Sequence, residues 1–197
     1  IDEQMEALGG DILSVSSAGF FSRGIARNQQ TLTTGDALAL AQQSVSFGGV
    51  VPEIDGRRQI KYGNKNLNLT VLGTTPNYAD VHLFSIATGR MFNQSDDSAR
   101  RRVVVLGAEV PNMLDTDATG ILGKTIQIRS ISFNVIGVLE AKGSSGWNSP
   151  DDDIWIPLST AQFRVTGSDF VKTISIKVRE DSSIELAMVD IESVLRR

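Results

Sequence analysis

The spacing of apolar residues along the chain predicts short strands that alternate with helices. Residues 11–16 and 173–178 carry apolar side chains at alternating or nearly alternating positions, as half-buried strands do. After Ser182, which has Glu185 three positions later, one apolar stripe recurs at helical spacing and predicts an amphipathic helix. The stripe comprises Ile184, Ala187, Met188, Ile191, Val194 and Leu195.

A second helix is predicted shortly after residue 30. Thr33 and Asp36 have the spacing of a capping box, and a glycine pair at 48–49 ends the pattern. Two strands follow, at 50–54 and 57–62, and the pair Asp55-Gly56 between them is typical of a tight turn. A second turn at residues 63–66 returns the chain into a strand at 67–72.

The middle of the chain has a different pattern of short helices and strands. We predict helices at 76–84 and 108–114, a turn-rich passage at 86–92 and a buried strand at 103–106. Residues 126–128 and 131–135 are predicted to form a hairpin across Arg129-Ser130. A last helix is predicted from the cap Ser159 to residue 165, where Gly167 stops it. The fold class is therefore mixed α/β. Because strand–helix units flank this middle, sequence order indicates one domain inserted into another, with residues 1–77 and 168–197 in the first and 78–167 in the second.

Composition limits the possible functions. At 197 residues and 41% apolar content, the chain is long enough to bury a sizeable core. Its formal net charge of -4 argues against nucleic acid as a main partner, since phosphate binding needs a concentrated basic surface. The absence of cysteine excludes disulfides and cysteine nucleophiles. The chain starts at Ile1 within a helical pattern and without a cap, so we expect a fragment of a larger protein.

No spacing of reactive residues indicates an active site. His82, the only histidine, lies close to Asp80 and Ser85, but neighbours on a short helix rarely form a catalytic triad, which favours a structural or surface role. Three consecutive aspartates at 151–153 could bind calcium, yet their side chains would point in different directions, which favours a solvated acidic loop. We therefore predict no catalytic residue, no cofactor and no metal.

Three aromatic residues lie in segments that are otherwise polar. Phe20 and Phe21 belong to one such segment, and Trp147 belongs to a loop rich in Gly, Ser and Asp. Each aromatic side chain either anchors a contact with a partner or folds back onto its own core, and the sequence leaves both readings open. Our candidate partner-binding residues are these three together with Asp151 and Asp152, which follow Trp147 in the same loop.

Residues 73–92 read GTTPNYADVHLFSIATGRMF. They resemble the Gly-Thr-Thr-Pro-x-Tyr…Gly-Arg-x-Phe signature of the periplasmic core domain of MacB-like ABC-transporter permeases. Further blocks resemble the same family in the same order: Thr-Leu-Thr-x-x-Asp-Ala at 31–37, Tyr-Gly-Asn at 62–64, the strand at 102–107, the stretch 123–143, and Asp-Asp-x-x-Ile-Pro-Leu-Ser-Thr-Ala-Gln at 152–162.

The resemblance implies a periplasmic domain between the first two membrane helices of a permease that also has a cytoplasmic ATPase. Both chain ends would form a porter-like subdomain, and the insertion would form a sabre-like subdomain. This domain would have no catalytic residues. It would couple ATP-driven motion to export through a periplasmic adaptor, and it would face a second permease protomer in the intact transporter while being monomeric when isolated.

Two other readings come from different functional classes. A ligand- or lipoprotein-binding ectodomain of a related permease would show an apolar pocket between the subdomains. An independent enzyme would need a site at His82 or at a carboxylate pair, and its hydrolytic activity would be lost in His82→Ala.

Overall fold

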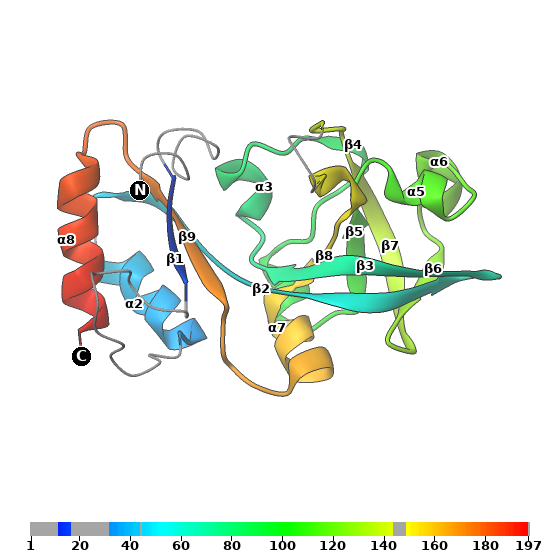
Figure 1. The fold of residues 1–197 in the computed structure, drawn as a ribbon, viewed down its shortest axis with the longest axis horizontal. Helices are drawn as coiled ribbons and strands as arrows, with labels where there is room; N and C mark the ends of the chain where they lie inside the picture. Colours follow the sequence, from blue (N-terminus) through cyan, green and yellow to red (C-terminus); the bar gives the residue numbers. More distant parts are fainter. Residues whose placement is uncertain (1–11, 17–31, 44, 144–148, 197) are drawn as a thin grey trace, which may run out of the picture. The chain divides into compact units, whose positions relative to one another are not determined.

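A computed structural model describes residues 12–16, 32–43, 45–143 and 149–196, shown in Figure 1. They include both strands and helices, so the mixed α/β class is confirmed. The chain divides into two compact units, Ile1–Glu53 with Asp169–Arg197, and Ile54–Ser168. We call them unit 1 and unit 2 and describe each by itself. The subdomain limits expected from the sequence, 1–77 with 168–197 and 78–167, stay a prediction.

Unit 1 contains an antiparallel sheet with β9 at its centre. Strand β9 (Thr173–Val178) pairs with β1 (Ile12–Ser16) on one side and with residues 47–53 of β2 (Phe47–Tyr62) on the other. The helices α2 (Thr34–Gln43) and α8 (Ile184–Leu195) contact each other. Both strands predicted at the ends of the chain are confirmed, because their alternating residues do reach a buried sheet face.

The helix starts in unit 1 follow the predicted capping chemistry with one correction. Asp36 Oδ2 accepts a hydrogen bond from Thr33 N at 2.8 Å, and Asp36 N donates to Thr33 Oγ1 at 3.3 Å, so this capping box is confirmed. In α8 the N-cap is Ser183 rather than Ser182, because Ser183 Oγ accepts from the amide of Leu186. The prediction was wrong by one residue, since serines at both positions can start a helix.

The apolar stripe of α8 buries three of its six members. Ala187, Ile191 and Val194 are buried, whereas Met188 is 41% exposed. The buried residues recur at intervals of four and three, which keeps them on one face of the helix. Ile184 and Leu195 are partly buried, so Met188 is the one member of the predicted stripe that is exposed.

Strand β2 runs without interruption from unit 1 into unit 2, so the turn predicted at Asp55-Gly56 was wrong. An Asp-Gly pair closes a hairpin only when the strands on its two sides pair with each other. Here residues 47–53 pair with β9, and Ile60 and Lys61 pair with β6. The hairpin turn lies at Gly63, whose φ is 55°, as the predicted second turn requires.

Unit 2 combines parallel and antiparallel pairing. Its strand order is β3–β8–β5–β7–β4, and β6 pairs with both β2 and β7. The β3–β8 and β5–β7 pairs are parallel, and the other pairs are antiparallel. These strands are β3 (Lys65–Thr74), β4 (Ile86–Gly89), β5 (Val103–Leu106), β6 (Thr125–Ile128), β7 (Ile131–Leu139) and β8 (Ile154–Pro157).

Short helical segments connect the strands of unit 2. They are α3 (Tyr78–Val81), α4 (Gln94–Ser98), α5 (Val110–Met113), α6 (Ala118–Ile121), the 3-10 helix η2 (Pro150–Asp152), α7 (Leu158–Ala161) and the π-helical turn η3 (Gln162–Thr166). Two expectations need correction here. Ser159 lies inside α7 and does not cap it, and strand β4 lies in a passage predicted only as turn-rich.

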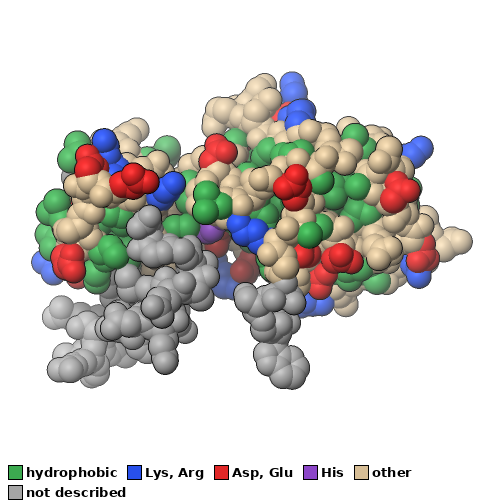
Figure 2. Space-filling model, turned by 90° about the horizontal axis from the view of Figure 1, so that it is seen from above, with side chains coloured by type: hydrophobic (Ala, Val, Ile, Leu, Met, Phe, Trp, Pro, Cys, Tyr) green, Lys and Arg blue, Asp and Glu red, His purple; other side chains and the backbone are tan. Residues whose placement is uncertain are grey.

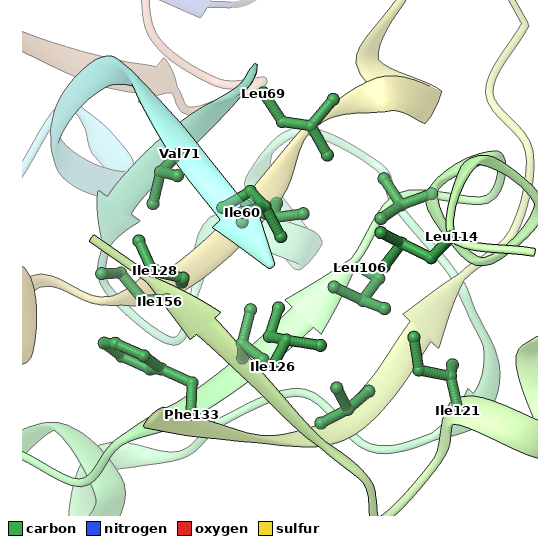
Figure 3. Close-up of a cluster of buried hydrophobic side chains, with 14 of the residues drawn as sticks. Ile60, Leu69, Val71, Leu106, Leu114, Ile121, Ile126, Ile128, Phe133 and Ile156 are labelled. Carbon is green, nitrogen blue, oxygen red and sulfur yellow. The ribbon is translucent and has the colours of Figure 1, made fainter. Parts of the chain in front are cut away.

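The core of unit 2 is built mainly from branched aliphatic side chains of its strands. Figure 3 shows Ile126, Ile128, Phe133 and Ile156 directed toward one another, and each of them is fully buried. Burial of each such side chain contributes roughly 1.5–3 kcal/mol, which makes this cluster the main source of stability in the unit. The β6–β7 hairpin around it was predicted correctly, with left-handed backbone at Arg129 and Ser130.

Candidate partner-docking site

The structure describes two of the five residues selected from the sequence as partner-binding candidates. Asp151 and Asp152 lie in η2, directly after the segment that carries Trp147. Phe20, Phe21 and Trp147 lie outside the described residues. Their assignment to a docking surface therefore stays a prediction.

Asp151 holds together the two ends of the segment that carries Trp147. The residue is 6% exposed, and its carboxylate accepts hydrogen bonds from the backbone amides of Lys142 at 2.7 Å and Gly143 at 3.0 Å. Its own carbonyl oxygen accepts from the amide of Glu109 at 3.0 Å. A carboxylate that accepts two amide hydrogen bonds makes charge-assisted contacts, which fix the base of the segment on unit 2.

Gly107 is essential to this arrangement because the backbone passes very close to it. A Cβ at this position would lie 2.4 Å from the carbonyl oxygen of Asp151. The amide of Gly107 also donates to the carbonyl oxygen of Asp153 at 2.8 Å. Any larger residue at 107 would push the aspartate segment away from β5.

An aromatic cluster lies in the same unit, built on α3 and β8. The rings of Tyr78 and His82 stack with centroids 4.3 Å apart, and Phe84 lies 5.5 Å from Trp155. Lys142 joins this cluster to the Asp151 site, because its ammonium group lies 4.6 Å from the Phe84 ring centroid and donates to the carbonyl oxygen of His82 at 2.9 Å. The cation therefore satisfies a carbonyl at the end of α3.

His82 is unsuited to acid–base chemistry at neutral pH. Burial, together with the nearby positive charge of Lys142, lowers the pKa of His82 to about 4. The imidazole is therefore neutral at pH 7. Its Nε2 is buried and has no hydrogen-bond partner in the described part of the chain. This supports the structural role favoured for His82 by the sequence.

Asp153 keeps its proton to an unusually high pH. Burial, followed by the negative charges of Asp152 and Asp55, raises the pKa of Asp153 to about 6, and Arg57 offsets part of the effect. The three consecutive aspartates thus have different environments, with Asp151 buried and hydrogen-bonded. Within the described ranges, no group of three or more His, Asp or Glu side chains is placed to share a metal ion.

The sequence reasoning missed a buried ion-pair network beside η3. Asp96 is fully buried, and its carboxylate contacts the guanidinium groups of Arg90 at 2.7 Å and Arg101 at 3.0 Å. Burial alone would raise the pKa of Asp96, but hydrogen bonds from Arg90, from the Asn93 amide and from Arg101 lower it overall. The signal that could have found it is the capping-box spacing of Asn93 and Asp96.

A second buried carboxylate ties α4 to α7. Asp97 accepts hydrogen bonds from the amide and the hydroxyl of Ser159 at 3.0 and 3.1 Å. Thr160 Oγ1 donates to the carbonyl oxygen of Arg101 at 2.7 Å. Ser159 therefore serves the contact between these helices, which is why it does not act as a cap.

Charge on the visible face of the molecule in Figure 2 is mixed. Among the described residues of that face, acidic and basic side chains are interspersed with hydrophobic ones. A surface of this kind suits specific contacts with proteins better than binding to a uniformly charged polymer.

The family model described as the MacB-like periplasmic core domain matches residues 1–194. The chain belongs to this family. It is therefore the periplasmic core domain of a MacB-like ABC-transporter permease, as the sequence resemblance implied. No helix among the described residues is long and apolar enough to cross a membrane.

Curated relatives agree with this assignment. The chain is 29% identical over 200 residues to the macrolide export ATP-binding/permease protein MacB of Bdellovibrio bacteriovorus. The alignment covers 100% of this chain and 31% of that protein. It is 30% identical over 188 residues to the MacB protein of Chlorobium luteolum, covering 94% of this chain and 28% of the relative. The chain thus spans about a third of the length of these relatives.

Solved structures share the fold. The periplasmic region of MacB from Actinobacillus actinomycetemcomitans superposes with a TM-score of 0.80 at 24% identity, covering 98% of this chain and 86% of the other. The extracellular domain of the noncanonic ABC-type transporter YknZ from Gram-positive bacteria gives a TM-score of 0.73 at 18% identity. This superposition covers 94% of this chain and 91% of the other. The MacB-like core domain therefore keeps its fold across widely diverged sequences.

Proposed function

We propose that this core domain couples ATP-driven motion in the rest of the permease to substrate export by docking a periplasmic adaptor protein. The observation that carries the proposal is the base of the segment containing Trp147. There, the buried carboxylate of Asp151 joins Lys142 and Gly143 and so fixes both ends of the segment on unit 2. Fixed backbone on both sides of a binding segment lowers the entropic cost of docking a partner there.

The domain acts in this proposal as a mechanical and docking module without a reaction of its own. The buried carboxylates of Asp96, Asp97 and Asp151 are engaged in hydrogen bonds that hold helices and backbone together. His82 is neutral and stacked on Tyr78. ATP hydrolysis belongs to a separate nucleotide-binding domain, so we expect the isolated core domain to show no ATPase activity.

Binding of the complete permease to its cognate periplasmic adaptor tests the proposal. In surface plasmon resonance, we expect the wild-type permease to bind and the variants Phe20→Ala, Phe21→Ala and Trp147→Ala to bind about tenfold or more weakly, as expected when an aromatic anchor is truncated. Leu186→Ala serves as a control, because it shortens an exposed apolar side chain elsewhere. A wild-type permease that does not bind its adaptor would refute the proposed function.

The alternative of a ligand- or lipoprotein-binding ectodomain finds less support within unit 2. A hollow of about 20 Å³ there is lined by residues that include Ile54, Val71 and Ile156 together with Asp55 and Arg58. Sites for small molecules usually enclose roughly 300–1,000 Å³. This hollow is therefore too small for an acyl chain, and docking of a protein remains the better proposal.

A further inference from the structure

One exposed aromatic residue in unit 2 lies between two arginines. Phe163 lies in η3 and is 59% exposed. The guanidinium carbon of Arg100 lies 4.3 Å from the centroid of its ring, and that of Arg164 lies 5.8 Å from it. Arg129 reaches the same turn, because its Nη1 donates to the carbonyl oxygen of Val165 at 2.9 Å. We call Phe163, Arg100, Arg164 and Arg129 the Phe163 surface.

The second feature of the Phe163 surface is its positive charge. Among the residues that the structure describes, no carboxylate forms an ion pair with Arg100, Arg129 or Arg164. Arg101, next in sequence to Arg100, is different because it is paired with the buried Asp96. Two guanidinium groups near one aromatic ring, with a third bonded to the same turn, stand out in a protein whose net charge is -4.

Hydrogen bonds fix the backbone that carries Arg100 at the end of α4. At the end of α4, the amides of Arg100 and Arg101 donate to the carbonyl oxygens of Asp97 and Asp96, and Arg100 takes a left-handed φ of 51°. This is the geometry with which many helices end. It directs the chain at Arg100 toward the turn that carries Phe163.

Buried hydrogen bonds fix the element carrying Arg100 against the element carrying Phe163. The Asp97 carboxylate accepts from Ser159 at the start of α7, and Thr160 donates to the Arg101 carbonyl oxygen. Helix α7 continues directly into the π-helical turn η3, a type of turn that is often found at functional sites. The surface is thus pre-organised, which lowers the entropic cost of binding.

We propose that the Phe163 surface docks an acidic segment of the periplasmic adaptor, with carboxylates of that segment accepting hydrogen bonds from Arg100 and Arg164 and an apolar side chain packing on Phe163. Planar guanidinium groups bind carboxylates in a bidentate manner, and aromatic and arginine residues dominate the energy of protein interfaces. This inference rests on the proposed function, because the adaptor is the partner that the domain docks.

An acidic protein segment fits this surface better than a lipid bilayer does. Segments that lie on membranes usually present a broad apolar face bordered by many basic residues. Here one exposed ring has two guanidinium groups close to it. Such a compact arrangement matches a few carboxylates on one chain.

The test uses the complete permease and its cognate adaptor in surface plasmon resonance at low and high salt. We expect Phe163→Ala, and separately the pair Arg100→Glu with Arg164→Glu, to weaken adaptor binding about tenfold or more. High salt should weaken the wild-type complex more than the complex of the charge-reversed variant. Salt screens the attraction between the arginines and the acidic segment, and the variant no longer has that attraction. Lys61→Glu, an exposed charge reversal on β2, is the matched control and should bind like wild type.

The outcomes separate this inference from the function on which it rests. If the wild-type permease does not bind the adaptor, the proposed function fails and the inference fails with it. If wild type binds and the variants of the Phe163 surface bind equally well, only the inference is overturned. Circular dichroism confirms that each variant is folded, and Arg164→Gln replaces the double variant if the latter unfolds.

Two further measurements test whether the Phe163 surface binds something other than the adaptor. Sedimentation of the permease variants with vesicles of phosphatidylglycerol and phosphatidylethanolamine shows whether the surface binds lipid instead. Analytical ultracentrifugation of the core domain shows whether it binds a second copy of the chain. Loss of vesicle binding or of self-association in the variants, with adaptor binding intact, overturns the proposal.

Discussion

At the scale of single residues, the buried carboxylate of Asp96 is the most sensitive position in unit 2. Asp96→Ala removes the partner of Arg90 and Arg101 and one half of a capping box. We expect it to reduce the free energy of unfolding by about 2–4 kcal/mol, as measured by denaturant unfolding. Lys65→Ala breaks an exposed ion pair with Asp115 and should cost less than about 1 kcal/mol. Equal losses in the two variants would contradict a special role for Asp96.

The same residue makes stability depend on pH in a defined direction. The pKa of Asp96 is lower in the folded protein than its ordinary value of 3.8. Its stabilising contribution is therefore complete above that value and is lost as the pH falls through the folded pKa. Acid unfolding of wild type should be steeper in this range than that of Asp96→Ala.

Asp153 makes the stability of the fold depend on pH in the opposite direction. Its pKa rises from 3.8 to about 6 in the folded protein, chiefly through burial. The folded state therefore binds the proton more tightly, and stability falls as the pH rises from about 3.8 to 6 and then levels off. We expect Asp153→Asn to raise the melting temperature at pH 7.5 and to have little effect near pH 4. A variant that is less stable at both pH values would contradict this assignment.

At the scale of elements, Asp151 should control the order of the segment that follows Lys142. Asp151→Ala leaves the amides of Lys142 and Gly143 without their acceptor. We expect faster hydrogen exchange at these two amides, measured by NMR or mass spectrometry, because exchange follows the opening of the local hydrogen bond. Exchange in α8 should stay unchanged. Asp152→Ala is the control, since within the described part of the chain both amides donate to Asp151 and not to Asp152.

Helix α8 should act through stability alone. Ile191 is buried, so Ile191→Asp places an unpaired charge in the core of unit 1 and should cost at least about 3 kcal/mol. Val189 lies on the same helix but is 61% exposed, and Val189→Asp should leave the fold intact. Far-ultraviolet circular dichroism during denaturant unfolding compares the two. A folded Ile191→Asp variant would contradict the packing of α8.

Elements whose signals are local could be predicted from the sequence. The alternation in β9 and the spacing of the β6–β7 hairpin identified both correctly. The turn expected at Asp55-Gly56 was wrong because the choice of strand partners decides whether such a pair turns, and those partners lie far away in the sequence. Local chemistry alone is compatible with either outcome.

The candidate surfaces depend even more on distant contacts. Asp97 meets Ser159 across 62 positions of sequence, and the Phe163 surface exists only because that contact joins α4 to α7. The sequence pattern predicted Ser159 as a cap, so neither its pairing with Asp97 nor the Phe163 surface could be foreseen. The domain's identity came from the family resemblance. The motifs of that resemblance mainly occupy packing positions, so they indicate the family and not the docking surface.

At the scale of the whole molecule, the isolated domain should be a monomer, because pairing with a second protomer would be imposed by the rest of the permease. Stable interfaces usually bury about 1,200–2,000 Å². Helix α8 exposes three apolar residues, Leu186, Met188 and Val189, which cover a small part of such an area. Sedimentation should give a mass near 21.3 kDa at all concentrations. A concentration-independent dimer that dissociates in Leu186→Asp would instead make α8 a homodimer interface.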